Sequence, residues 1–244
     1  MSSALFEKPK IQIAGENALI IYFAEHADSE VAVRVQHAVQ AIRTKLTNDI
    51  IDLIPSYASI LVVFNQLDID HHQLRNKLRA VLSHLTEGKL IKGEIIELPV
   101  YYSTESGPDL ALIAQQANLS IEQVIELHQA KEYRVYAIGF APGFAYLGEV
   151  DKRIAMPRLS TPRLKVPQGA VAIADRQTAV YPSESPGGWN IIGNCPVKMF
   201  DAAVTDPKAS MPVQVGDKVK FKAISKQEFL TLGGVFSSEL GQGV

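Results

Sequence analysis

The sequence predicts a two-domain protein in which an α+β unit precedes a mainly β unit. Its 244 residues are 47% hydrophobic and 20% charged, a composition that builds compact cores without disulfides or metals. In the first 93 residues, β-rich runs alternate with two segments of helical periodicity. From residue 133 onward, short β-rich runs are separated by Gly and Pro, which is typical of a β-barrel.

The first domain is expected to begin with a hairpin. Residues 11–23 contain two apolar runs, and the turn-prone residues 15–17, Gly-Glu-Asn, separate them. An amphipathic helix should follow the capping residues Asp28 and Ser29, because apolar side chains recur at helical spacing over residues 31–46.

The rest of the first domain repeats this order. Two β-rich runs, residues 50–54 and 59–64, precede a second amphipathic helix over residues 74–85. Strands, helix, strands and helix in this order favour a small sheet with both helices on one face, an α+β sandwich of the ferredoxin-like kind. A polar, turn-prone stretch near Gly93 ends this domain, which we place at residues 1–93.

The second domain, residues 94–232, opens with a strand over residues 95–102. Two short helices follow. Pro108 marks the start of the first, and Ser120 with Gln123 forms a Ser-x-x-Gln capping box at the start of the second.

The remaining β-rich runs are expected to form a barrel into which the two helices are inserted. These runs are residues 133–140, 170–174, 178–181, 191–192, 197–200 and 218–223. A final short helix is capped by Ser225 and Glu228, and residues 233–244 are expected to form a loose tail.

Charge and motif content exclude several functional classes. The 24 Lys and Arg residues against 26 Asp and Glu give a net charge of -2, so no basic field favours nucleic acid or an anionic membrane. No apolar run reaches the roughly 18 residues of a membrane helix, and the N-terminus lacks a signal peptide's apolar core, so we expect a cytoplasmic protein. The sequence contains no nucleotide phosphate loop, no GxGxxG turn and no GxSxG elbow.

The chemically informative region is residues 139–201. It begins with GFAPGFAYLG at residues 139–148, which combines three glycines with three aromatic residues. Glycines allow close approach of a ligand, and Phe140, Phe144 and Tyr146 would line the apolar wall of a pocket. An alternative of equal weight is a barrel corner with the aromatic side chains in the core.

Two arginines follow in the segment MPRLSTPR at residues 156–163. Residues 151–165 contain five basic residues against Asp151 alone, a local net charge of +4. Each of Arg158 and Arg163 follows a proline that restrains the backbone, and a guanidinium can bind a carboxylate or phosphate through two hydrogen bonds. We therefore predict an anion clamp. The alternative is a solvated loop whose arginines pair with nearby acids.

Polar residues farther along complete the predicted site. Gln168, Gln177 and Tyr181 can hydrogen-bond an amide or a carboxylate. Glu184, in a loop that contains two prolines, is the candidate for proton transfer, although a turn or cap role has about equal weight. Trp189, the sole tryptophan, is expected to line this region, more as core than as a ligand platform.

Cysteine and histidine usage favours structural roles. Cys195 has no histidine nearby in sequence and is expected to be an inert buried thiol. The six histidines show no His-Glu-x-x-His pattern or zinc-type spacing, so a surface or helix-face position is favoured over metal ligation. We predict no metal site.

Three long motifs resemble the KipI family. They are GFAPGFAYLG at 139–148, MPRLSTPRLKVPQGAVAIADRQTAVYP at 156–182 and SPGGWNIIGNCPVKMFD at 185–201. GPDL at 107–110 and LHQAKEYRVYAIGF at 127–140 fit the same pattern. Members of this family are also called the B subunit of the prokaryotic 5-oxoprolinase, PxpB, and have been labelled allophanate hydrolase subunit 1. The resemblance covers nearly the whole sequence of the second domain. In the first domain, only the order of the expected strands and helices is similar.

The resemblance implies an N-terminal α/β domain followed by a cyclophilin-like β-barrel. It further implies a permanent partnership with a KipA-family protein, PxpC. Together with a third protein, PxpA, such proteins cleave 5-oxoproline to glutamate with ATP hydrolysis. The chain alone is expected to be folded but inactive, because it lacks a phosphate loop and a complete catalytic set.

In this picture the residue chemistry suggests a role for each polar group. Arg158 and Arg163 would hold the substrate carboxylate or a transferred phosphate. Gln168 and Gln177 would orient the amide, and Glu184 would move a proton.

The resemblance leaves other functions open. One branch of the family inhibits a sporulation histidine kinase, and related sequences occur in urea carboxylase. A non-catalytic kinase inhibitor and a component of a urea- or allophanate-degrading system are therefore alternatives. This chain also has Ala172, Asp175 and Ala179 where the family pattern has small residues, usually glycine, and Asp175 adds a carboxylate near the expected pocket.

Overall fold

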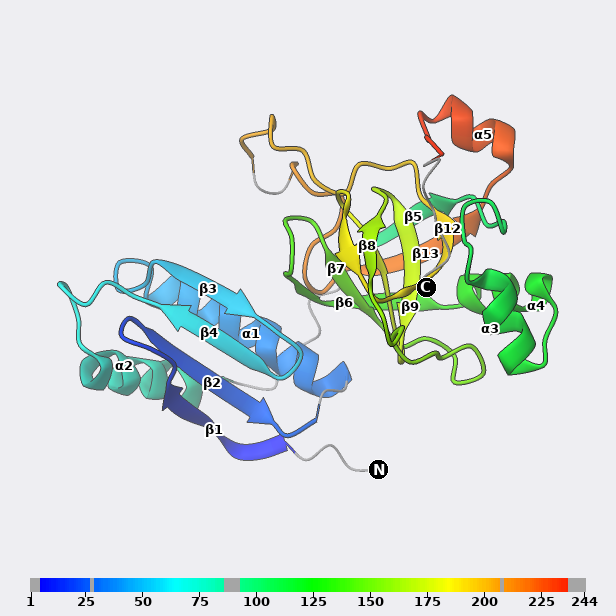
Figure 1. Cartoon of the computed structure of the whole chain (residues 1–244). Coiled ribbons are helices and arrows are strands. Elements are labelled where there is room, and N and C mark those ends of the chain that lie inside the picture. The colour runs from blue at the N-terminus through cyan, green and yellow to red at the C-terminus, as the bar shows by residue number, and fades with distance from the viewer. Residues whose placement is uncertain (1–4, 27–28, 86–92, 207–208, 237–244) are drawn as a thin grey trace. The chain divides into compact units, whose positions relative to one another are not determined.

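The computed structural model describes residues 5–26, 29–85, 93–206 and 209–236 (Figure 1). The chain divides into two compact units, Met1–Lys92 and Gly93–Val244, and each has its own hydrophobic core. Among the described residues, no helix combines the length and the apolar character needed to cross a membrane.

The first unit is a four-stranded antiparallel sheet packed against two helices (Figure 1). Its strands are β1 (Leu5–Ile13), β2 (Ala18–Ala24), β3 (Asp52–Pro55) and β4 (Ser59–Val63), in the spatial order β1-β2-β4-β3. The helices α1 (Ser29–Lys45) and α2 (His71–Ser83) contact each other and the sheet. Alternate residues of β2, namely Leu19, Ile21 and Phe23, are fully buried in the shared core. The predicted order of elements is confirmed.

The start of α2 is set by a local capping bond. The Asp70 carboxylate accepts a hydrogen bond from the Gln73 N–H at 2.8 Å, so the helix begins three residues before the predicted range. The predicted cap Asp28 of α1 lies outside the described residues, and Ser29 is already the first residue of that helix.

The second unit is built on a seven-stranded sheet that nearly closes into a barrel. In the order β12-β9-β10-β7-β6-β13-β5, its strands are Asn190–Asn194, Ala170–Ala174, Gln177–Val180, Ala145–Gly148, Glu132–Ile138, Lys218–Ala223 and Ile95–Val100. Strands β13 and β5 are parallel, and the other neighbours are antiparallel. The two edges meet where Tyr101 and Asn194 exchange backbone hydrogen bonds of 2.9 and 3.0 Å. A separate small sheet pairs β8 (Arg163–Val166) with β11 (Ser185–Gly187).

Strand β9 separates two apolar clusters of the second unit. Its side chains alternate, so that Val171 and Ile173 belong to the main barrel core. Ala170, Ala172 and Ala174 belong to a smaller cluster on the opposite face. We call this opposite face the alanine face.

The predicted helical insertion consists of α3 (Leu110–Ala117) and α4 (Ile121–Gln129), between β5 and β6. The capping box of α4 is confirmed. The Ser120 hydroxyl accepts from the Gln123 N–H at 3.2 Å, and the Gln123 side chain accepts from the Ser120 N–H at 2.9 Å. Pro108 lies just before the N-cap residue of α3, Asp109.

One strand prediction for the second unit was wrong, and three strands were missed. Residues 197–200 form no strand, because the Cys195 N–H already bonds to the Gly169 carbonyl at 2.8 Å and Pro196 has no N–H to extend the ladder. Strands β7, β8 and β11 were not foreseen, since each spans only three or four residues and shows too little alternation to detect.

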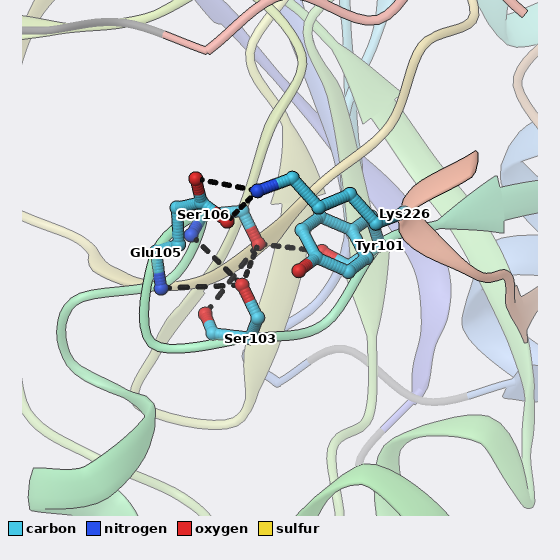
Figure 2. A network of polar contacts seen from close by, with 5 residues as sticks. All are labelled: Tyr101, Ser103, Glu105, Ser106 and Lys226. Atoms are coloured by element: carbon cyan, nitrogen blue, oxygen red, sulfur yellow. Dashed lines mark hydrogen bonds and ion pairs between the residues drawn. The ribbon is translucent and has the colours of Figure 1, made fainter. Parts of the chain in front are cut away.

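The turn after β5 contacts the last helix, α5 (Lys226–Thr231), through the polar contacts that Figure 2 shows. Lys226 Nζ donates to both carboxylate oxygens of Glu105, at 2.9 and 2.8 Å. The Ser106 hydroxyl donates to the Tyr101 carbonyl at 2.7 Å, and the Ser103 hydroxyl accepts from the N–H groups of Glu105 and Ser106. These bonds hold the turn in one conformation.

Apolar contacts also fix α5. Its capping box of Ser225 and Glu228 is confirmed, and Phe229 is fully buried. The Phe236 ring lies 5.2 Å from that of Phe229. The start of the predicted tail is therefore in contact with the helix, whereas residues 237–244 lie outside the described part of the chain.

Candidate functional site

Five aromatic side chains meet on the alanine face and form what we call the aromatic cluster. Phe144 is at its centre, with ring centroids 5.2 Å from Phe140, 4.9 Å from Tyr146, 5.2 Å from Tyr181 and 5.6 Å from Trp189. Phe144 and Tyr146 share a face because they are two residues apart at strand β7. The structure brings these five predicted residues together. It also buries Phe144, Tyr181 and Trp189, as expected for the alternative of a barrel corner with aromatic side chains in the core.

Small side chains on the sheet give these rings room. Ala172 of β9 lies directly opposite Ala179 of β10, and both are fully buried beside the aromatic cluster. Asp175, by contrast, is exposed in the turn between these strands, with a φ of 52°, and its N–H bonds to the Met156 carbonyl. Its carboxylate therefore belongs to a solvated hairpin turn.

Phe140 is the exposed member of the aromatic cluster. Its side chain is 65% exposed and its φ is 71°, a left-handed conformation that is uncommon for an aromatic residue. The loop turns back at Gly143, where a Cβ would collide with the Met199 carbonyl and the φ is 81°. Such backbone outliers concentrate at ligand sites, so this loop is a candidate contact surface.

Arg158 is exposed and lies over the aromatic cluster. Its guanidinium carbon is 5.8 Å from the centroid of the Trp189 ring. The flanking backbone is held on both sides, because the Leu159 N–H bonds to the Gly188 carbonyl and the Asn190 side chain bonds to the Pro157 carbonyl. No ion pair of Arg158 occurs among the described residues, so its charge is available to an anion.

Arg163 is in a different environment. Its side chain is only 6% exposed, and Nη2 donates to Asp109 Oδ1 at 2.8 Å. The other carboxylate oxygen of Asp109 accepts from the Ile191 N–H at 2.7 Å. Arg163 Nε and Nη1 are buried and have no hydrogen-bond partner among the described residues. The alternative prediction was a solvated loop whose arginines pair with nearby acids. Arg163 does pair with an acid, but both side chains of the pair are buried in the protein.

Tyr181 supplies a buried hydroxyl to the same region. Burial raises the pKa of Tyr181 to about 12, although the charges of Arg158 and Arg163 act to lower it. At neutral pH the phenol is therefore protonated and can donate a hydrogen bond. Gly187 is required beside it, because a Cβ there would collide with the Tyr181 hydroxyl.

The other predicted polar residues are less closely associated with the aromatic cluster. By strand alternation, Gln177 shares the face of Ala179. Gln168 and Glu184 are exposed, and no hydrogen bond among the described residues joins either side chain to the cluster. Asp109 was not predicted as a site residue, although its signal was present in GPDL at 107–110.

His128 on α4 lies in the barrel core, on the inward face of its helix. Its Nδ1 is 2.7 Å from the Tyr102 hydroxyl and its Nε2 is 2.9 Å from the Thr178 hydroxyl, which itself donates to the Ala172 carbonyl. Thr178 has no second proton to donate, so His128 Nε2 carries the proton and Nδ1 accepts from Tyr102. Burial lowers the pKa of His128 to about 3, and the ring is neutral in the folded protein.

Cys195 is buried, as predicted, and burial raises the pKa of its thiol to about 12. A protonated thiol is a poor nucleophile and a poor metal ligand. Within the described part of the chain, no group of three or more His, Cys, Asp or Glu side chains could hold a metal ion.

The sequence is similar to bacterial proteins of known name. The family profile "Carboxyltransferase domain, subdomain C and D" matches residues 9–210. The chain is 36% identical to the B subunit of 5-oxoprolinase from Bacillus subtilis, covering 90% of this chain and 95% of the relative. It is 33% identical to the corresponding 5-oxoprolinase B subunit from Escherichia coli O157:H7, with coverages of 88% and 96%.

Solved structures share the fold. TTHA0988 superimposes with a TM-score of 0.74 at 32% identity, over 85% of this chain but only 40% of that longer chain. The urea amidolyase of K. lactis matches with a TM-score of 0.75 over 93% of this chain and 16% of the amidolyase. At 17% identity, the second match concerns the fold alone.

Proposed function

We propose that this chain, which belongs to the KipI family of 5-oxoprolinase B subunits, is one component of an ATP-dependent 5-oxoprolinase. Its partners would be PxpA and the KipA-family protein PxpC. The observation on this chain that supports a ligand site is the aromatic cluster with Arg158 beside it, which forms no ion pair with any residue that the structure describes. An apolar wall next to a cation suits a small ring that carries a carboxylate.

The chemistry requires activation of a stable amide. Transfer of the γ-phosphoryl group of ATP to the lactam oxygen would make the ring carbon more electrophilic. Water would then add to that carbon, and the C–N bond would break as the nitrogen gains a proton, which leaves the phosphoryl group on the new carboxyl group of glutamate. A second water would hydrolyse this acyl phosphate to glutamate and inorganic phosphate. The sequence contains no phosphate loop, so we expect ATP to bind with the help of the partner proteins.

Residues of this chain would bind and orient the substrate. Phe140, the exposed member of the aromatic cluster, would contact the ring, and Arg158, which lies over Trp189, would attract the carboxylate or a transferred phosphate. Tyr181, protonated at neutral pH, would donate a hydrogen bond. Gln168 and Gln177 remain our candidates for orienting the amide, and Glu184 is our candidate for moving a proton.

The order β1-β2-β4-β3 with two helices suits a ferredoxin-like first unit, and the nearly closed sheet suits a cyclophilin-like second unit. We propose these fold types for the two units. The second unit would then provide this chain's share of the substrate site, since it contains the aromatic cluster and both arginines.

Reconstitution tests the proposal. The chain is purified alone and together with PxpA and PxpC from the same source, and phosphate and glutamate are measured with and without 5-oxoproline. We expect 5-oxoproline-dependent ATP hydrolysis only in the complete mixture. Activity of the isolated chain would disprove its dependence on partners. Turnover of urea or allophanate in place of 5-oxoproline would disprove the proposed substrate.

A further inference from the structure

Asp109 and Arg163 form a buried ion pair that joins three elements of the second unit. Asp109 is the N-cap residue of α3, Arg163 begins β8, and the Ile191 N–H of β12 binds the second carboxylate oxygen. Asp109 is not used as a helix cap, since its side chain makes no capping bond. The carboxylate instead holds the guanidinium in one place.

The pair leaves part of the guanidinium unused. Nε and Nη1 of Arg163 are buried without a hydrogen-bond partner among the described residues. A buried donor without a partner costs roughly 1–3 kcal/mol, more when it is charged, so a bound water or a ligand is needed to satisfy it. Nε of Arg75 and of Arg176 is also buried without a partner, but in the part of the chain that the structure describes only Arg163 has two such nitrogens. Arg163 also lies close enough to Tyr181 for its charge to lower the pKa of that phenol, which connects the pair with the aromatic cluster.

We propose that Asp109 is a positioning residue that fixes Arg163 so that its free N–H groups bind the anionic group of the substrate, a carboxylate or a phosphate. The two arginines then have different tasks. The Asp109–Arg163 pair is neutral as a whole and supplies directed donors, whereas Arg158 supplies the uncompensated positive charge. This inference rests on the proposed function for the identity of the substrate, but not for the recognition of an anion.

Ligand binding to the full chain, and to its reconstituted complex, tests this inference directly. The probes are 5-oxoproline, inorganic phosphate and 2-pyrrolidinone, which has the same lactam ring without the carboxylate. Because Arg163 Nε and Nη1 are buried, an anion must displace protein atoms to reach them. Gly187 pairs with Arg163 in the small sheet, and the sole tryptophan, Trp189, follows two residues later, so its fluorescence should report binding. We expect a response to 5-oxoproline or to phosphate, which identifies the source of the anion, and none to 2-pyrrolidinone.

Two variants separate positioning from simple charge. Asp109→Asn makes the site more positive by one charge, so a site that acts by charge alone would bind the anion more tightly. We expect instead a loss of about 10-fold or more in affinity, because Arg163 is no longer held. The double variant D109L/R163M replaces the pair with apolar side chains, a change that often preserves stability. It should fold and assemble but lose anion binding by a similar factor.

An exposed pair in the same part of the chain provides the matched control. Arg153 Nη2 lies 3.0 Å from Asp151 Oδ2 at the surface, and Asp151→Asn should leave anion binding unchanged. Should D109L/R163M fail to fold, Arg163→Lys takes its place, because it retains the charge and removes the planar donors.

Several results would overturn the inference. Anion affinity within 2-fold of the parent in D109L/R163M, or in Arg163→Lys, would show that the pair is structural and that water satisfies the free nitrogens. Equal binding of 2-pyrrolidinone and 5-oxoproline, or no anion binding by the chain or complex, would also exclude the proposed role. If the pair controls anion binding but the complex does not open 5-oxoproline, the inference stands and the proposed function fails.

Discussion

Protonation of His128 should destabilise the second unit below neutral pH. The ring is buried and neutral, with its pKa lowered by burial from an ordinary 6.5 to about 3. As the pH falls below about 6.5, the unfolded chain binds a proton on this residue and the folded chain does not, so unfolding becomes more favourable. The stability contributed by the neutral ring is therefore present at pH 7 and is lost progressively as the pH falls toward about 3.

The size of this loss follows from the two pKa values. Each pH unit between them changes the free energy of unfolding by about 1.4 kcal/mol, so lowering the pH from 7 to 5 should cost about 2 kcal/mol. No other histidine of the second unit can contribute to this loss of stability, because His128 is the only histidine in residues 93–244. Urea unfolding followed by the fluorescence of Trp189, which is in the same unit, measures it.

His128→Gln removes the titrating group and can retain hydrogen bonds to Tyr102 and Thr178. We expect the parent to lose about 2 kcal/mol more than this variant between pH 7 and pH 5. Replacement of the exposed His72 of the first unit by Gln provides a control and should not reduce the parental loss. Equal losses in the parent and H128Q, or an imidazole NMR signal for His128 that titrates between pH 6 and 7 in the folded protein, would refute the reasoning.

Four further outcomes are expected. Phe229→Ala should destabilise the second unit by about 3–5 kcal/mol in urea unfolding, whereas Lys226→Met should cost less than about 1 kcal/mol, because Phe229 is fully buried and the Lys226–Glu105 pair is half exposed. In urea unfolding, the Asp175→Gly variant should be more stable than the Asp175→Ala variant by roughly 0.5–1 kcal/mol, because the φ of 52° at this position suits glycine. Equal stabilities of the two variants would contradict this. Cys195→Ser should leave turnover by the reconstituted complex within about 2-fold, and the native thiol should resist alkylation at neutral pH; rapid labelling would argue against burial. Arg158→Lys or Arg158→Ala should lower kcat/KM by about 10-fold or more in that complex, and parental values in both would show a merely solvated side chain.

Local signals in the sequence determined most of the secondary structure. The capping boxes at Ser120 and Ser225 were predictable because each depends on residues three positions apart. The association of Phe140, Phe144 and Tyr146 was predicted from their place in one Gly-rich motif. Strand β7, which explains why Phe144 and Tyr146 share a face, was not foreseen. The prediction of a strand at residues 197–200 failed because it relied on local β-rich composition alone. Pro196 and the end of β12 prevent a strand there.

Only the tertiary structure decided which of the polar residues cooperate. Arg158 and Arg163 look alike in sequence, each after a proline in a basic segment, yet one is exposed over Trp189 and the other is buried against Asp109, 54 residues away. Likewise, His128 reaches Thr178 across 50 residues. Whether a charged group is hydrated or paired depends on the elements that pack around it. For Arg163 these are Asp109 at the start of α3, strand β8 and Ile191 of β12, which no local pattern in the chain connects.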